Sequence, residues 1–183
     1  MKRLANFLLF QIGWTIAVAG AARGAIWLGP VVMAVVVGVH VGMVSDRARQ
    51  LRYILLVGLF GTLADTLLAS LGATSYPSSA PHWPFAFAPP WISALWIGFA
   101  TLPRFSLAWL AQRPWLAALL GATGGPLSYF AGVRMGAVGV SADPLLTWAS
   151  LAVEYSLATP LLLHFAPRSP AQDAVAHPTR HSG

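Results

Sequence analysis

The sequence contains no cysteine and few charged residues, and both features restrict what the protein can be. Without cysteine the chain can form no disulfide, no thiolate metal site and no cysteine nucleophile. Charged residues make up only 9% of its 183 residues, whereas 57% are hydrophobic. One soluble core could not bury that much apolar surface. The composition therefore predicts a protein whose main solvent is a lipid bilayer.

Sequence motifs of known catalytic sites are also absent. The chain has no glycine-rich phosphate loop with lysine, no metalloprotease histidine pair and no nucleophile elbow. A lone histidine within an apolar run, as at His40, is more typical of a packed residue than of a metal ligand. We predict no catalytic residue, no metal site and no cofactor, and we do not expect an enzyme.

The formal net charge of +6 does not indicate nucleic-acid binding. The eleven basic residues occur singly or in small groups beside apolar runs, whereas a nucleic-acid interface gathers them along one face. We therefore expect no nucleic-acid partner.

Six stretches of about 20 mostly apolar residues are each long enough to cross the hydrocarbon core of a bilayer. They predict an all-α integral membrane protein, a bundle of six transmembrane helices that forms one domain over residues 1–166. The predicted spans cover residues 4–22, 25–44, 52–72, 91–111, 115–137 and 144–166.

Basic residues predict the orientation of this bundle, because cytoplasmic loops carry an excess of lysine and arginine. With the amino end inside, eight basic residues lie on the cytoplasmic side and only Arg23 and Arg134 lie outside. Both chain ends are then cytoplasmic. The first span also resembles a secretory signal peptide, since it follows Lys2 and Arg3 and ends in small residues. Its cleavage would leave five helices in the same orientation.

Two segments do not fit a regular span. Residues 73–90 hold five prolines interleaved with aromatic residues, which favours an interfacial loop over a substrate lid. Residues 167–183 form a polar tail that we expect to be disordered.

Most predicted spans carry a polar residue, which should face the protein interior because polar groups are costly in hydrocarbon. Prolines at positions 103 and 126 break helix geometry next to several of these residues, as in transporter helices that expose binding groups. The resulting candidates for ligand or proton contact, as opposed to a purely structural role, are Gln11, Asp65, Arg104, Ser128, Tyr129 and Glu154.

The depth of each residue in the bilayer indicates which of these residues could form an ion pair. At 1.5 Å per residue, Glu154 and Arg104 differ in depth by about 6 Å, and Arg104 and Asp65 by about 9 Å. A long arginine side chain can span the shorter distance, so we predict an Arg104–Glu154 pair. Asp65 would then lack a cation at its own level, and its burial would favour the protonated form that a proton-coupled carrier uses.

Four local patterns together resemble the bacterial family called domain of unknown function 2878. They are residues 6–14 (NFLLFQIGW), residues 63–68 (LADTLL), residues 124–129 (GGPLSY), and Glu154 after an alanine-rich run. The resemblance implies a multi-pass protein of the bacterial inner membrane. It brings no established activity or substrate, and hints only at a connection with envelope lipids.

Three functions are compatible with these observations. The first is a non-catalytic accessory or scaffold role tied to envelope lipids, in which the polar residues lock helix packing. The second is a small carrier or substrate-binding subunit that uses a polar ring around Asp65, Arg104 and Glu154. The third is a membrane-embedded enzyme acting on lipid, for which no acid, base and nucleophile are visible. The expected partners are membrane lipids and, in the first case, another membrane protein.

Overall fold

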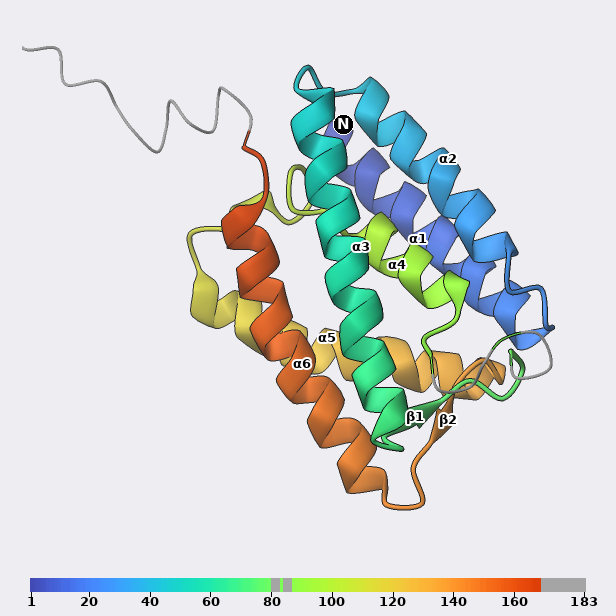
Figure 1. Ribbon diagram of the computed structural model, residues 1–183. Coiled ribbons are helices and arrows are strands. Elements are labelled where there is room, and N and C mark those ends of the chain that lie inside the picture. The colour runs from blue at the N-terminus through green and yellow to red at the C-terminus, as the bar shows by residue number, and fades with distance from the viewer. Residues whose placement is uncertain (80–82, 84–86, 169–183) are drawn as a thin grey trace, which may run out of the picture.

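The computed structural model describes residues 1–79, 83 and 87–168, and within these residues it is built almost entirely of helices (Figure 1). Two short strands, β1 (Thr74–Ser75) and β2 (Gly139–Val140), pair antiparallel with Thr74 opposite Val140. The six α-helices are α1 (Lys2–Ala22), α2 (Leu28–Gly42), α3 (Arg47–Ser70), α4 (Pro90–Phe99), α5 (Pro114–Met135) and α6 (Pro144–Phe165).

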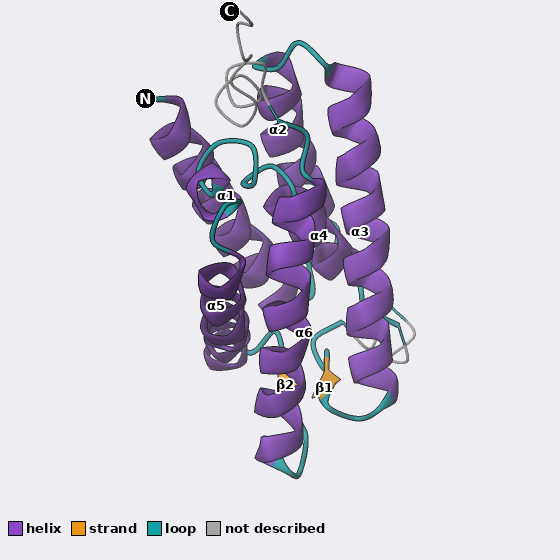
Figure 2. Cartoon of the chain, turned by 90° about the vertical axis from the view of Figure 1, so that its left-hand side faces the viewer, coloured by secondary structure: helices purple, strands orange, loops and turns teal. Residues whose placement is uncertain are grey.

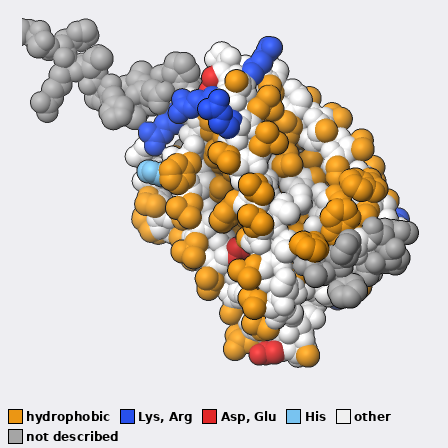
Figure 3. All heavy atoms as spheres, in the orientation of Figure 1, with side chains coloured by type: hydrophobic (Ala, Val, Ile, Leu, Met, Phe, Trp, Pro, Cys, Tyr) orange, Lys and Arg blue, Asp and Glu red, His pale blue; other side chains and the backbone are white. Residues whose placement is uncertain are grey.

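Four of the helices, α1, α3, α5 and α6, are long and apolar enough to cross a membrane. Their outer faces are rich in large hydrophobic side chains. In α3, for example, Leu55, Leu59 and Leu63 are each about 60% exposed (64%, 58% and 61%). Figure 3 shows hydrophobic side chains spread over the visible face of the molecule. Contiguous apolar surface of this extent is unusual on a soluble monomer, whereas a bilayer solvates it. These helices are therefore membrane-like.

Basic side chains gather at one end of the bundle. The amino end of α1, the connection between α2 and α3, and the carboxyl end of α6 all lie toward the top of Figure 1, and Figure 3 shows lysine and arginine there. The β1–β2 pair lies at the opposite end. The charge asymmetry read from the sequence is thus also an asymmetry of the folded molecule.

The fourth predicted span, residues 91–111, differs most from the structure. Helix α4 begins at Pro90 but ends at Phe99 after only ten residues, and turns lead to a short 3-10 helix at Ala108–Leu110. Pro103 accounts for the early end, because proline lacks a backbone donor and disfavours helical geometry in the residue before it. The α2 helix is also shorter than predicted and starts at Leu28, after a turn in which Gly24 has a φ of +80°.

The segment after α3 folds into the bundle. Tyr76 and Ser79 are almost fully buried, at 2% and 1% exposure, and the Ser79 hydroxyl accepts a hydrogen bond of 3.2 Å from the Trp91 indole N–H. In the first part of the predicted interfacial loop over residues 73–90, the Tyr76 ring thus lies in the protein interior and not on the surface. Residues 80–82 and 84–86 of this loop, and the tail from residue 169 onward, lie outside the described residues.

Helix α5 lies crosswise to α3. It is seen along its length in Figure 1 and nearly end-on in Figure 2. It packs closely on α6 through two glycines. A Cβ atom at Gly121 would collide with the backbone oxygen of Tyr155, and one at Gly125 with the Tyr155 ring. Small residues at this spacing allow helix backbones to approach closely. Gly121 and Gly125 therefore allow α5 to lie directly against α6.

Candidate functional site

Asp65 is fully buried in the middle of the bundle and accepts three hydrogen bonds from three different segments. Its Oδ2 accepts from the Trp96 indole N–H of α4 at 2.6 Å. Its Oδ1 accepts from the Tyr76 hydroxyl at 3.3 Å and from the Tyr129 hydroxyl of α5. An indole N–H can only donate, so Oδ2 acts as an acceptor. The carboxyl group thus fastens α3, α4, α5 and the β1 segment together.

Aromatic rings surround this carboxyl group. Trp96 stacks on Tyr155 of α6, with ring centroids 5.1 Å apart and an interplanar angle of 20°. The Tyr155 ring also contacts the Tyr129 ring, with 6.2 Å between the ring centroids. The glycine at position 61 makes room for this arrangement, because a Cβ atom there would collide with the Trp96 ring. A glycine in α3 therefore lets a large indole reach the Asp65 carboxylate.

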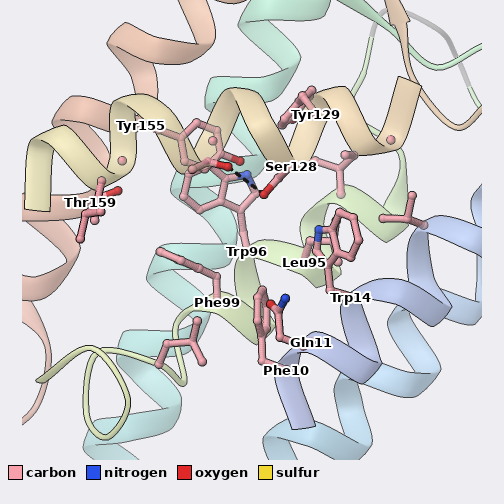
Figure 4. Close-up of a pocket in the computed structure, with 18 of the residues that line it drawn as sticks. Phe10, Gln11, Trp14, Leu95, Trp96, Phe99, Ser128, Tyr129, Tyr155 and Thr159 are labelled. Atoms are coloured by element: carbon pink, nitrogen blue, oxygen red, sulfur yellow. Dashed lines mark hydrogen bonds between the residues drawn. The ribbon is translucent and has the colours of Figure 1, made fainter. Parts of the chain in front are cut away.

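A cavity of about 260 Å³ lies beside Asp65, between α1, α4 and α5 (Figure 4). Asp65 and Tyr129 form part of its wall, and most of the remaining wall is apolar. Figure 4 shows the side chains of Phe10 and Trp14 from α1 lying toward those of Trp96 and Phe99 from α4. Asp65 is the only lining residue of a charged type among the described residues. The cavity is thus an aromatic chamber with one carboxyl group in its wall.

Exposed residues of α1 and α5 mark where this cavity opens. Phe7 and Gln11 on α1, and Gly124 and Ser128 on α5, line the cavity and are also exposed on the outside of the bundle. Figure 2 shows α1 and α5 on the same side of the molecule. A Cβ atom at Gly124 would meet no atom within 4 Å, so the missing side chain leaves open space. The mouth therefore lies between the faces of two apolar helices.

Arg104 pairs with Asp46 and not with Glu154, so the predicted ion pair is wrong. The Arg104 Nη2 lies 2.6 Å from Oδ1 of Asp46, and its Nη1 donates to Oδ2 at 2.9 Å. The fourth helix is not continuous as predicted but ends at Phe99, and the irregular segment that follows brings Arg104 to the amino end of α3. The hydrogen bond from Arg104 lowers the pKa of the Asp46 carboxyl group below its ordinary value.

Further polar side chains are hydrogen-bonded to this pair or to the segment that carries Arg104, and we define the Arg104 cluster as Asn6, Asp46, Gln50, Thr101, Arg104 and Ser106. Gln50 accepts a hydrogen bond of 3.2 Å from Arg104. Asn6 donates to the Thr101 hydroxyl at 3.3 Å and accepts from Ser106 at 2.7 Å. The cluster joins α1 and α3 to the irregular segment after α4. Non-helical backbone at membrane depth needs such burial and pairing in protein.

The structure divides the six candidate residues into two groups. Gln11, Asp65, Ser128 and Tyr129 line the cavity, whereas Arg104 and Glu154 do not. Within residues 1–79, 83 and 87–168, neither carboxyl oxygen of Glu154 has a hydrogen-bond partner. The same described residues contain no group of three or more histidine, cysteine or acidic side chains that could hold a metal ion.

Sequence reasoning missed the aromatic members of the site, chiefly Trp96, Tyr76 and Tyr155. All three are typical of membrane-protein sequences, in which aromatic residues are frequent near interfaces. One signal was available: Gly61 lies one helical turn before Asp65, and a glycine beside a buried acid leaves room for a large donor side chain.

Comparison with known proteins supplies one match. No curated protein and no solved structure matches this chain. The model of one protein family, described as "Protein of unknown function (DUF2878)", matches residues 3–161. That range contains all six helices except Lys2 of α1 and the end of α6, and it includes Asp65 and every residue of the Arg104 cluster. The resemblance of the four sequence patterns is thereby confirmed, and the chain belongs to the DUF2878 family.

Proposed function

We propose that this protein is a multi-pass membrane protein that binds an amphipathic small molecule from the surrounding bilayer, as a carrier or a substrate-binding subunit. The observation that carries the proposal is the cavity beside Asp65. Ligand sites are typically concave and largely apolar, with a few polar groups that orient the ligand. This cavity has that composition, with Asp65, Tyr129, Gln11 and Ser128 as its polar groups.

The position of the mouth supports entry from the lipid phase. Phe7, Gln11 and Trp14 lie in the first two thirds of α1, a helix of 21 residues and about 30 Å. If α1 crosses the bilayer, the gap between α1 and α5 faces hydrocarbon. A ligand with an apolar portion could then enter sideways without passing through water.

The proposed location is the bacterial inner membrane, with both chain ends in the cytoplasm and six crossings, the fourth made by α4 together with the irregular segment that ends in the 3-10 helix Ala108–Leu110. The grouping of basic side chains at one end of the bundle supports this orientation. Because the chain has no cysteine, single-cysteine variants can test it directly. Ser45→Cys, at the basic end, should react with a membrane-impermeant maleimide only after the cells are opened. Ala142→Cys, at the opposite end, should react in cells with a permeable outer membrane.

A pair of glycine variants tests ligand binding. Gly124→Leu should fill the cavity mouth without a backbone collision, because a Cβ atom there meets nothing within 4 Å. Gly38→Leu is the matched control, since Gly38 is equally open but lies on α2, away from this cavity. Protein extracted in native nanodiscs should carry about one equivalent of a specific amphiphile, measured by native mass spectrometry. Gly124→Leu should lose it and Gly38→Leu should retain it.

A second candidate is a non-catalytic accessory or scaffold role linked to envelope lipids, with another membrane protein as partner. The Arg104 cluster favours it, because its polar groups serve helix packing and lie away from the cavity. If no amphiphile is enriched in the wild-type protein, the carrier proposal fails and this role takes its place. Neither candidate assigns a catalytic residue to the chain.

A further inference from the structure

We infer that the polar end of the ligand is a quaternary ammonium group, held in the cavity beside Asp65. This inference rests on the proposed function and adds the chemical class of the ligand. Three independent features of the cavity support it: the charge of its wall, the hydrogen bonds that Asp65 already makes, and the aromatic rings around it.

The charge of the wall selects against anions. No lysine, arginine or histidine occurs among the described residues that line the cavity, and Asp65 is the one acidic residue. Arg104, which is buried, is paired with Asp46 in a different cluster. A buried anion without a partner is strongly disfavoured, whereas a buried cation would lie beside the carboxyl group of Asp65, which three hydrogen-bond donors stabilise in its ionised form. A ligand whose terminal group is a phosphate or carboxylate therefore does not fit beside Asp65.

The hydrogen bonds to Asp65 favour a cation that needs none of its own. A carboxylate offers about four acceptor positions, and three of them are taken by Trp96, Tyr76 and Tyr129. A primary ammonium brings three donors and would find few acceptors in a largely apolar wall. A quaternary ammonium has no N–H donor and is attracted by charge alone. Asp65 is therefore better suited to bind a quaternary ammonium group than a primary one.

The aromatic rings supply the remaining attraction. Quaternary ammonium groups are recognised by cages of aromatic side chains, whose ring faces carry negative charge density. Phe10, Trp14 and Phe99 lie around the hollow together with Trp96 (Figure 4). Tyr155 covers one face of the Trp96 ring. Trp14 is only partly buried, so its indole ring is better placed to contact the cation. We assign Trp14 as a cation-binding residue.

Matched amphiphiles test this inference on the full-length protein in nanodiscs. The probes share a decyl chain and differ in the head group: decyltrimethylammonium, decylphosphocholine, decyl maltoside and decyl sulfate. Each is titrated below its critical micelle concentration, and binding to the Gly124→Leu protein is subtracted as the contribution of the bilayer. Decyltrimethylammonium should bind at least about tenfold more tightly than decyl maltoside, and decyl sulfate should bind most weakly.

The possible results distinguish a failure of the ammonium inference from a failure of the proposed function. If decyl maltoside and decyltrimethylammonium bind equally, and Gly124→Leu abolishes both, amphiphile binding stands but the ammonium inference is overturned. If no probe distinguishes wild type from Gly124→Leu, the proposed function fails as well. Decylphosphocholine shows which kind of molecule supplies the ammonium group. If it binds as tightly as decyltrimethylammonium, the ligand has a choline lipid head group. If it binds more weakly, the ligand is an amphiphile without phosphate.

An aromatic substitution separates ring recognition from general packing. Trp14→Leu should weaken decyltrimethylammonium binding by about tenfold and decyl maltoside binding much less. Trp115→Leu is the matched control, because Trp115 is 70% exposed and does not line the cavity. Equal loss of both probes in Trp14→Leu would mean that Trp14 only shapes the cavity, and its role as a cation-binding residue would be excluded.

Discussion

Arg104 and Asp46 form a two-contact ion pair across 58 residues of sequence, with N–O distances of 2.6 and 2.9 Å. Arg104 is only 5% exposed, whereas the Asp46 side chain is 29% exposed. The pair fastens the irregular segment after α4 to the amino end of α3. It makes Asp46, which lies outside every predicted span, a principal structural residue of the fold.

Removing the Asp46 charge should destabilise the protein because it leaves Arg104 buried without its counter-ion. We expect Asp46→Asn to lower the free energy of unfolding by about 3 kcal/mol. Thermal unfolding of the purified protein in detergent measures the effect. Asp143→Asn is the control, because Asp143 caps α6 by accepting from the Leu145 N–H, and asparagine caps helices equally well. Equal melting temperatures for Asp46→Asn and wild type would contradict the prediction.

Acid should weaken the fold through the same carboxyl group. The pKa of Asp46 is lowered in the folded state by the hydrogen bond from Arg104, so protonation costs more in the folded than in the unfolded chain. Its contribution to stability is complete above the ordinary aspartate pKa of about 4 and is lost as the pH falls through the lower, folded-state value. Melting temperatures measured across this range should fall less steeply in Asp46→Asn than in wild type.

Two adjacent glycines of α5 should respond oppositely to the same small change. Alanine at position 125 would collide with the Tyr155 ring, so Gly125→Ala should lower the free energy of unfolding by about 1–3 kcal/mol. Gly124→Ala meets open space and should be neutral or stabilise the helix by up to about 1 kcal/mol. Melting temperatures of the two variants give the comparison, and similar values would show that α5 does not pack on α6 as described.

Loss of one donor to Asp65 should also be measurable. Tyr129→Phe removes the hydroxyl that donates to Oδ1 and should lower the free energy of unfolding by about 1–3 kcal/mol. Thr123→Val likewise removes one hydroxyl, but Thr123 is exposed and bonds only backbone oxygens of its own helix, so it should change stability by less than about 0.5 kcal/mol. A Tyr129→Phe protein as stable as Thr123→Val would exclude an important bond between Tyr129 and Asp65.

Much of the helical organisation could be predicted from the sequence. The predicted spans 115–137 and 144–166 lie close to α5 (Pro114–Met135) and α6 (Pro144–Phe165). Burial of Asp65 was also predictable, because an acid within an apolar run must turn away from lipid. Gly121 and Gly125 have the small-residue spacing that is typical of helix contacts, and both pack tightly. Gly38 and Gly42 have the same spacing and meet no atom within 4 Å, so that pattern alone cannot say which glycines pack within the chain.

The partners of the buried polar groups could not be predicted. Depth along a helix gives one coordinate of a side chain, but a contact also depends on which helices are neighbours and on whether each helix is continuous. The fourth helix ends before Pro103, so a rise of 1.5 Å per residue no longer gives the position of Arg104. Tyr76 was equally unpredictable, since it reaches Asp65 from a segment without regular structure.

The sequence by itself determined that this is a membrane-like helical protein, where most of its helices lie and which end carries the basic residues. Each of these properties depends on the hydropathy and charge of residues that are neighbours in the sequence. Only the tertiary structure decided that Arg104 binds Asp46, that Trp96, Tyr76 and Tyr129 converge on Asp65, and that a cavity opens beside them. Those features join residues that lie far apart in the sequence, and their geometry follows from how side chains of different sizes pack.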